Sequence, residues 1–83
     1  MRRRKMLREI LDEAHRKYLE KNRDHGDAWK RMSILALKSA ILLKAERIFH
    51  GVSDEKVVDD ALDLINYSAM LIHRVRNESR QTI

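Results

Sequence analysis

The acidic and amide side chains of residues 59–66 have the spacing in this sequence that is best suited to chemistry. They are Asp59, Asp60, Asp63 and Asn66, at positions i, i+1, i+4 and i+7 of a segment with helical periodicity. This spacing places Asp59, Asp63 and Asn66 on one helix face, with Asp60 one turn from Asp63. Carboxylates this close repel one another and are costly to bury without a positive charge beside them.

Two kinds of partner would compensate these carboxylates, and the sequence leaves both open. A divalent cation such as Mg²⁺ binds carboxylate oxygens while keeping water ligands, which would make Asp60 and Asp63 both the metal ligands and the catalytic pair. Alternatively, basic side chains of the preceding helix would neutralise the aspartates in a salt-bridge network that fixes helix register. The basic candidates are Lys38, Lys44 and Arg47.

A second candidate is the segment Asp24-His-Gly-Asp-Ala-Trp29. His25 can donate a hydrogen bond to a phosphate, Gly26 lets the backbone approach a ligand closely, and Trp29 can stack on a base. With Lys44 and Arg47 on phosphates, and with Asn66, these side chains form the predicted substrate-binding set. The alternative is a turn that starts a helix, with Trp29 filling the core.

The elements that must position these residues are three helices of one all-α domain, residues 1–83. Apolar periodicity predicts helices at about 3–22, 27–49 and 53–78. We expect Asp24 to be the N-cap of the second helix and Ser53 that of the third. We expect Gly51 to end the second helix in the left-handed conformation.

The apolar surface of these helices exceeds what one chain can cover. Residues 34–43 are apolar almost all round, and the third helix has two apolar stripes. One contains Val58, Ala61, Leu62, Ile65, Ala69 and Ile72; the other contains Val57, Leu64, Met70, Leu71 and Val75. We therefore predict a helical bundle built from a homodimer or larger homo-oligomer, with Leu64, Leu71 and Val75 in the interface.

Composition excludes several classes of protein. The chain has no cysteine, hence no disulfide framework and no thiolate metal site. The basic start, residues 1–7, is not followed by an apolar stretch, so we expect no signal peptide, no membrane segment and a cytoplasmic protein. Residues 1–23 carry nine basic and four acidic side chains, which favours either a solvated helix surface or, as a weaker alternative, nucleic-acid binding.

Three short motifs resemble a family of small helical proteins, the nucleotide-modification-associated domain, formerly a domain of unknown function. They are Asp24-His-Gly-Asp-Ala-Trp29, Lys44-Ala-Glu-Arg-Ile48 and Asp63-Leu-Ile-Asn-Tyr67, in the order that the family shows. The resemblance covers roughly residues 18–74, and His25 stands where the family usually has tyrosine. It implies a role connected with nucleotides.

A more remote resemblance links residues 59–67 to the second acidic motif of the MazG-like all-α nucleotide pyrophosphohydrolases. It implies that Asp60 and Asp63 help bind Mg²⁺ and that the substrate is a nucleoside triphosphate. Where those enzymes carry the carboxylates of a first motif, this chain has Lys38, Ile41 and Lys44. We therefore predict a protein that binds nucleotides or their phosphates, and the sequence leaves open whether it hydrolyses them. The alternatives are a basic nucleic-acid-binding module and a purely structural oligomerisation module.

Overall fold

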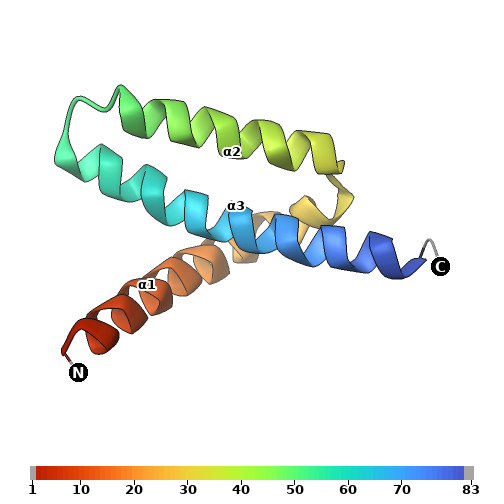
Figure 1. Cartoon of the computed structure of the whole chain (residues 1–83), viewed down its shortest axis with the longest axis horizontal. Coiled ribbons are helices and arrows are strands. Elements are labelled where there is room, and N and C mark those ends of the chain that lie inside the picture. The colour runs from red at the N-terminus through yellow and green to blue at the C-terminus, as the bar shows by residue number, and fades with distance from the viewer. Residues whose placement is uncertain (1, 82–83) are drawn as a thin grey trace.

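Three long helices and one short 3-10 helix make up residues 2–81, which the computed structural model describes, with the side chains of residues 6–23 and 26–78 (Figure 1). In chain order they are α1 (Arg2–His25), η1 (Ala28–Arg31), α2 (Ile34–Phe49) and α3 (Asp54–Gln81). No strand occurs within residues 2–81. The expected all-α fold is confirmed.

α3 is the central helix of the arrangement. α2 and α3 run side by side in opposite directions, joined by the short connection at residues 50–53 (Figure 1). α1 packs on α3 from another side, and its N-terminal half extends away from both other helices. Side chains of α1 and α2 therefore meet on α3 rather than on each other.

The interior of the single chain is small and partly charged. Among the described residues, the buried apolar side chains are Ala14 of α1, Leu37 of α2 and Leu62 of α3. Asp60 and Asp63 are buried as completely, with 3% and 4% of their surfaces exposed. Two of the three acidic residues of the sequence motif thus lie in the core of the helix packing.

The connection between α1 and α2 corrects the predicted start of the second helix. α1 continues through His25, and Gly26 ends it with φ of 59°, its N–H donating to the Asn22 carbonyl at 2.9 Å. The left-handed conformation favours glycine because it has no Cβ. Asp24 therefore lies inside α1, and its expected role as an N-cap is wrong; its side chain is outside the described residues.

α2 begins only at Ile34, after the single turn of η1. Ser33 is its N-cap: its backbone is extended and its Oγ accepts a hydrogen bond from the Ala36 N–H at 3.0 Å. Asp27, which was expected near a helix start, makes no capping hydrogen bond. Its carboxylate is used by side chains of α1 and η1, as described below.

The connection between α2 and α3 agrees with the sequence at Ser53 and differs at Gly51. Ser53 caps α3 through a hydrogen bond from the Lys56 N–H to its Oγ at 3.3 Å. Gly51 does not have a positive φ, so its expected left-handed conformation is wrong. Glycine is favoured at this position because there is no room for a side chain: an added Cβ would lie 2.5 Å from the Val57 side chain.

Much of the apolar surface stays uncovered in one chain. On α2, Leu35 and Phe49 are 72% and 84% exposed, so burial on every side of this helix does not occur within the chain. None of the helices in residues 2–81 combines the length and hydrophobicity that a membrane-spanning segment requires.

Candidate functional site

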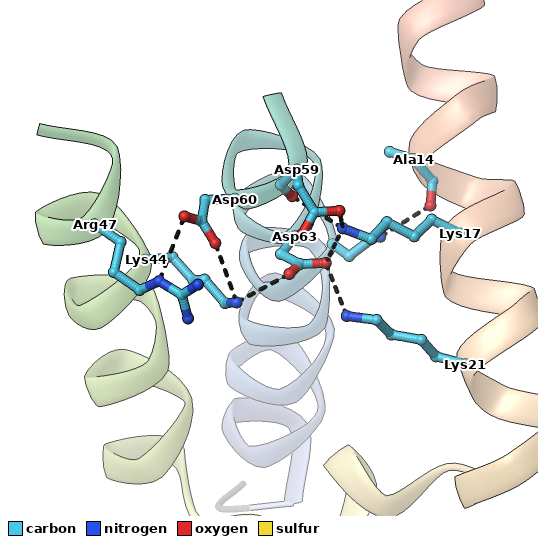
Figure 2. Close-up of polar contacts among 9 residues, drawn as sticks. Ala14, Lys17, Lys21, Lys44, Arg47, Asp59, Asp60 and Asp63 are labelled. Carbon is cyan, nitrogen blue, oxygen red and sulfur yellow. Dashed lines mark hydrogen bonds and ion pairs between the residues drawn. The ribbon is translucent and has the colours of Figure 1, made fainter. Parts of the chain in front are cut away.

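Asp63 lies at the centre of a cluster of charged side chains from all three long helices (Figure 2). Its Oδ1 is 2.9 Å from Lys17 Nζ and 3.0 Å from Lys21 Nζ, and both lysines belong to α1. Its Oδ2 is 2.9 Å from Nζ of Lys44 on α2. One carboxylate of α3 therefore joins both neighbouring helices.

Asp60 and Asp59 extend this cluster on either side of Asp63. Asp60 lies toward α2, with its Oδ1 3.4 Å from Lys44 Nζ and its Oδ2 3.4 Å from Arg47 Nε. Asp59 lies toward α1, where Lys17 donates hydrogen bonds to both its carboxylate and its backbone carbonyl. Figure 2 shows the aspartates between the cations of α2 and those of α1.

The lysine partners keep Asp63 ionised despite its burial. Burial alone would raise the pKa of Asp63, but hydrogen bonds from three lysines outweigh it and lower the pKa to about 2. Burial alone would likewise lower the pKa of Lys17 and Lys44, but hydrogen bonds to the aspartates raise both. Asp63, Lys17 and Lys44 are therefore all charged at neutral pH.

The same three aspartates are arranged so that they could hold a metal ion. Each of Asp59, Asp60 and Asp63 offers one carboxylate oxygen, and these oxygens lie within 4.8 Å of one another. Oxygen donors of this kind suit Mg²⁺. As the chain stands, the ammonium groups of Lys17, Lys21 and Lys44 lie against these oxygens, so a metal would have to displace them.

The charge balance of the cluster favours anions. Four cationic side chains, Lys17, Lys21, Lys44 and Arg47, surround three carboxylates. The cluster thus has a net charge of +1 before any ligand enters. An added Mg²⁺ alone would be repelled by this excess, whereas a phosphate would be attracted.

Of the basic residues expected beside the aspartates, the structure places two there and not the third. Lys44 and Arg47 contact Asp60, whereas Lys38 is exposed on α2 and takes part in no described ion pair of the cluster. Sequence reasoning missed Lys17 and Lys21, which lie 42 residues from their aspartate partners.

A cavity of about 230 Å³ opens beside the cluster and shares Asp63 and Lys21 with it. Its lining is mainly aromatic and apolar, with two amide side chains: Tyr18, Lys21, Asn22, Gly26, Ala28, Trp29, Met32, Asp63, Asn66, Tyr67 and Met70. A second hollow of about 380 Å³ shares Tyr18, Trp29, Asn66 and Met70 with the first. Trp29 therefore lines both hollows.

A chain of hydrogen bonds fixes Trp29 in the cavity wall. Trp29 Nε1 donates to Tyr18 Oη at 3.1 Å, and Tyr18 Oη donates to Asp27 Oδ1 at 2.9 Å. Asn22 also donates to Asp27, and Lys30 Nζ lies 2.9 Å from the other Asp27 oxygen. The hydrogen bond from Asn22, followed by those from Lys30 and Tyr18, holds the pKa of Asp27 well below its usual range.

Arg74 of α3 holds η1, and with it Trp29, against the rest of the chain. Its Nη1 donates to the carbonyls of Trp29 and Lys30, each at 3.2 Å, and to that of Met32. Its Nη2 pairs with Glu78 at 3.1 Å. The guanidinium thus donates to carbonyls at the end of the 3-10 turn, of which that of Trp29 also accepts from the Met32 N–H; no motif in the sequence indicated this role.

The remaining predicted site residues have different settings. Asn66 lines the cavity, but its Nδ2 also donates to the Ala14 carbonyl at 2.9 Å and so joins α3 to α1. His25 ends α1, and its side chain lies outside the described residues. Trp29, Asn66 and Asp63 are thus brought together around one cavity, while Lys44 and Arg47 lie on the α2 side of the aspartates.

Comparison with known families gives one match. Residues 21–75 match the family described as nucleotide modification associated domain 1. The chain belongs to this family. The match contains Trp29, Lys44, Asp63 and the cavity-lining residues of α3, so it covers every cavity-lining residue except Tyr18. Lys17, which pairs with Asp59 and Asp63, lies before the matched residues.

No curated protein and no solved structure matches the chain. The relation to the MazG-like enzymes therefore stays a prediction, which depends on Asp60 and Asp63 alone.

Proposed function

We propose that this domain binds a nucleotide, with its base in the cavity beside Trp29 and its phosphates at the lysines around Asp63. The proposal rests on one observation: Asp63 and Lys21 belong both to the charged cluster and to the lining of the aromatic cavity, so the two lie side by side. A flat apolar base next to an anionic phosphate chain is complementary to such a site. The family's description points to the same class of ligand.

The aromatic part of the site supports a base rather than a sugar or a peptide. Tyr18, Trp29 and Tyr67 line the cavity together with Met70, and ring faces stack well on nucleobases. The carboxamides of Asn22 and Asn66 supply polar groups at its wall. Small-molecule sites usually combine apolar walls with a few placed polar groups in this way.

The phosphates would take over lysines that now pair with aspartates. Lys21 is the most accessible, since 58% of its side chain is exposed and it reaches Asp63 from α1. Release of lysines toward phosphate oxygens would free carboxylate oxygens of Asp60 and Asp63 for Mg²⁺. We therefore propose that Mg²⁺ binds together with a nucleotide and only weakly without one.

We place nucleotide binding ahead of hydrolysis. Mg²⁺ held by Asp60 and Asp63 would supply the activation of water that pyrophosphohydrolases use. However, Lys38, Ile41 and Lys44 stand where those enzymes carry further carboxylates, and Lys44 instead neutralises Asp63. Nucleoside triphosphate turnover is therefore the less supported part of the proposal.

The cytoplasmic location and the self-association expected from the sequence also belong to this proposal. Exposed apolar side chains on all three helices support self-association.

Thermal unfolding with nucleoside mono- and triphosphates, each with and without Mg²⁺, tests the proposal. At ten times Kd a ligand adds about 1.4 kcal/mol, which raises Tm by about 5–10 °C for a domain of this size. We expect the largest shift with triphosphate and Mg²⁺ together and little with Mg²⁺ alone. Saturable stabilisation by Mg²⁺ alone would contradict the lysine-bound cluster, and no shift with any nucleotide would overturn the proposal.

Lys21→Met provides the matched test by titration calorimetry. Loss of one charge-assisted contact of about 1 kcal/mol should weaken nucleotide binding by about fivefold. Lys38→Met removes the same charge from the exposed surface of α2, away from the cavity, and should leave Kd unchanged. Equal effects of the two variants would mean that only net charge matters.

A further inference from the structure

α3 carries a partly exposed stripe with the spacing of a coiled-coil seam. Its members follow one another at alternating intervals of three and four residues: Val58, Ala61, Ile65, Ser68, Ile72 and Val75. Alternation of three and four is the heptad pattern that keeps one helix face turned to a partner helix. Val58, Ile72 and Val75 are 54%, 50% and 43% exposed and the other three members are partly buried, so the single chain covers the seam only in part.

The seam points away from the other helices of the chain. At 3.6 residues per turn, Asp63 lies on the opposite side of α3, where it contacts α1 and α2, and Asp60, which contacts α2, lies between that side and the seam. Leu64 and Leu71 share the side of Asp60 and are partly buried within the chain. Along the seam side runs an open hollow lined by Ala61, Leu64, Ile65, Ser68, Ala69 and Ile72.

The size of the exposed surface indicates a second copy as the occupant. The chain exposes 7042 Å², whereas a compact monomer of 9.9 kDa exposes roughly 5,200 Å² by the usual scaling with mass. Its radius of gyration is 14.2 Å, against about 12 Å for a compact domain of this length. The excess of roughly 1,800 Å² is ample for one side of a stable homodimer, for which about 800 Å² per partner is typical.

We propose that two copies of the chain pair through this seam, with their α3 helices antiparallel and a twofold axis passing between Asn66 and Tyr67. In this register Val58 faces the partner's Val75, Ala61 faces the partner's Ile72, and Ile65 faces the partner's Ser68. Each alanine or serine therefore meets an isoleucine, and the two valines meet each other.

This pairing follows from the order of large and small side chains. Antiparallel alignment pairs a large with a small side chain in the four central layers and two valines in each end layer, which fills space evenly. A parallel pair would set Ile65 on Ile65 and Ala61 on Ala61, with crowded and empty layers in turn. Only the antiparallel register makes the stripe complementary to itself, as a twofold interface requires.

The inference rests on the self-association proposed above and adds its surface and direction. It does not depend on nucleotide binding, because the cavity and the lysines lie on the other side of α3. The paired molecule would therefore keep both nucleotide sites open.

Disulfide trapping tests the register, since the chain has no cysteine of its own. The double variant Val58→Cys/Val75→Cys should form a covalent dimer on oxidation. The two positions lie about 25 Å apart along one helix, too far for a bond within a chain. Val58→Cys alone should not cross-link. Efficient cross-linking of the single variant would indicate a parallel pair and overturn the register.

Sedimentation of Ala61→Arg separates failure of the register from failure of self-association. We expect the wild type to sediment at twice the monomer mass at micromolar concentration and Ala61→Arg at the monomer mass, both helical by circular dichroism. Ala45→Arg makes the same change at an exposed position of α2 and should stay dimeric. If the wild type is a monomer, the proposed self-association is wrong. If Ala61→Arg is still a dimer, self-association holds but the proposed α3 interface is wrong.

Discussion

Asp63 is a buried carboxylate that binds three lysines at once rather than one. Lys17, Lys21 and Lys44 all lie within 3.0 Å of its oxygens. Burying charges is expensive, and a buried ion pair adds little net stability compared with apolar packing. Loss of one partner is costly, however, because it leaves opposite charges uncompensated in a desolvated place. The cluster therefore specifies how the helices meet more than it strengthens their packing.

Asp63→Asn should destabilise the ligand-free chain by about 3 kcal/mol, because it leaves partly buried ammonium groups without their carboxylate. Urea unfolding at neutral pH measures the loss. Asp59→Asn is the matched control, since 62% of that side chain is exposed; its cost should stay below about 1 kcal/mol. Equal costs would contradict the central place of Asp63.

The contribution of Asp63 should disappear in acid. Its pKa is about 2 in the folded chain, below the ordinary value of 3.8, so its ionised form is favoured by folding. Its stabilisation is therefore complete above about pH 4 and is lost as the pH falls toward 2, a change of about 2 kcal/mol. The stability gap between wild type and Asp63→Asn should narrow by that amount across this window. A gap that stays constant with pH would rule out the shifted pKa.

At this scale the sequence indicated the aspartates and half of their partners. The spacing of Asp60 and Asp63 on one helix predicted that they need compensation, and Lys44 was among the expected lysines. Lys17 and Lys21 could not be predicted, because the side of α3 on which α1 packs depends on the turn at Gly26. Helical periodicity predicts which residues share a face of one helix, but it does not predict where a second helix crosses that helix.

Among the elements, η1 departs most from the sequence pattern. Residues 27–33 contain no proline and no glycine, the two residues that most often interrupt a helix. The sequence pattern therefore predicted that the second helix begins at residue 27. The structure breaks it twice, by the left-handed Gly26 and by the extended backbone of Met32 and Ser33. The three long helices followed from apolar periodicity, whereas this break depends on a guanidinium that arrives from α3.

Arg74→Met should release η1 while keeping the aliphatic part of the side chain. Carbonyls of Lys30 and Met32 would lose the guanidinium donor, and that of Trp29 would keep only the Met32 N–H, at a cost of about 1–3 kcal/mol. Trp29 is the single tryptophan of the chain, so its fluorescence should shift to the red as its site opens to water. Arg76→Met, on the exposed surface two residues away, should change neither quantity. An unchanged spectrum for Arg74→Met would mean that the hydrogen bonds of Tyr18 hold Trp29 without help.

As a whole, the molecule has its charges inside and many of its apolar side chains outside. Asp60 and Asp63 are buried, whereas leucines and a phenylalanine of α2 and isoleucines of α1 and α3 are exposed. The sequence predicted this surplus of apolar surface and placed Leu64, Leu71 and Val75 in the interface. Leu64 and Leu71 are partly buried within the chain, whereas Val75 is 43% exposed and belongs to the seam proposed above. How much of each apolar stripe stays exposed depends on tertiary packing and does not follow from hydrophobicity alone.

The sharing of Asp63 between two helices sets a relation between ligand binding and local motion. Lys17 and Lys21 fasten α1 to α3 through this carboxylate, so a phosphate that draws lysines away also loosens α1. Part of the intrinsic binding free energy is then spent on opening that contact, and the measured affinity is the remainder. Under the proposed nucleotide binding, the domain as a whole would gain stability from its ligand while the amides of α1 would exchange more readily with solvent. Global stability and local protection would thus change in opposite directions at one carboxylate.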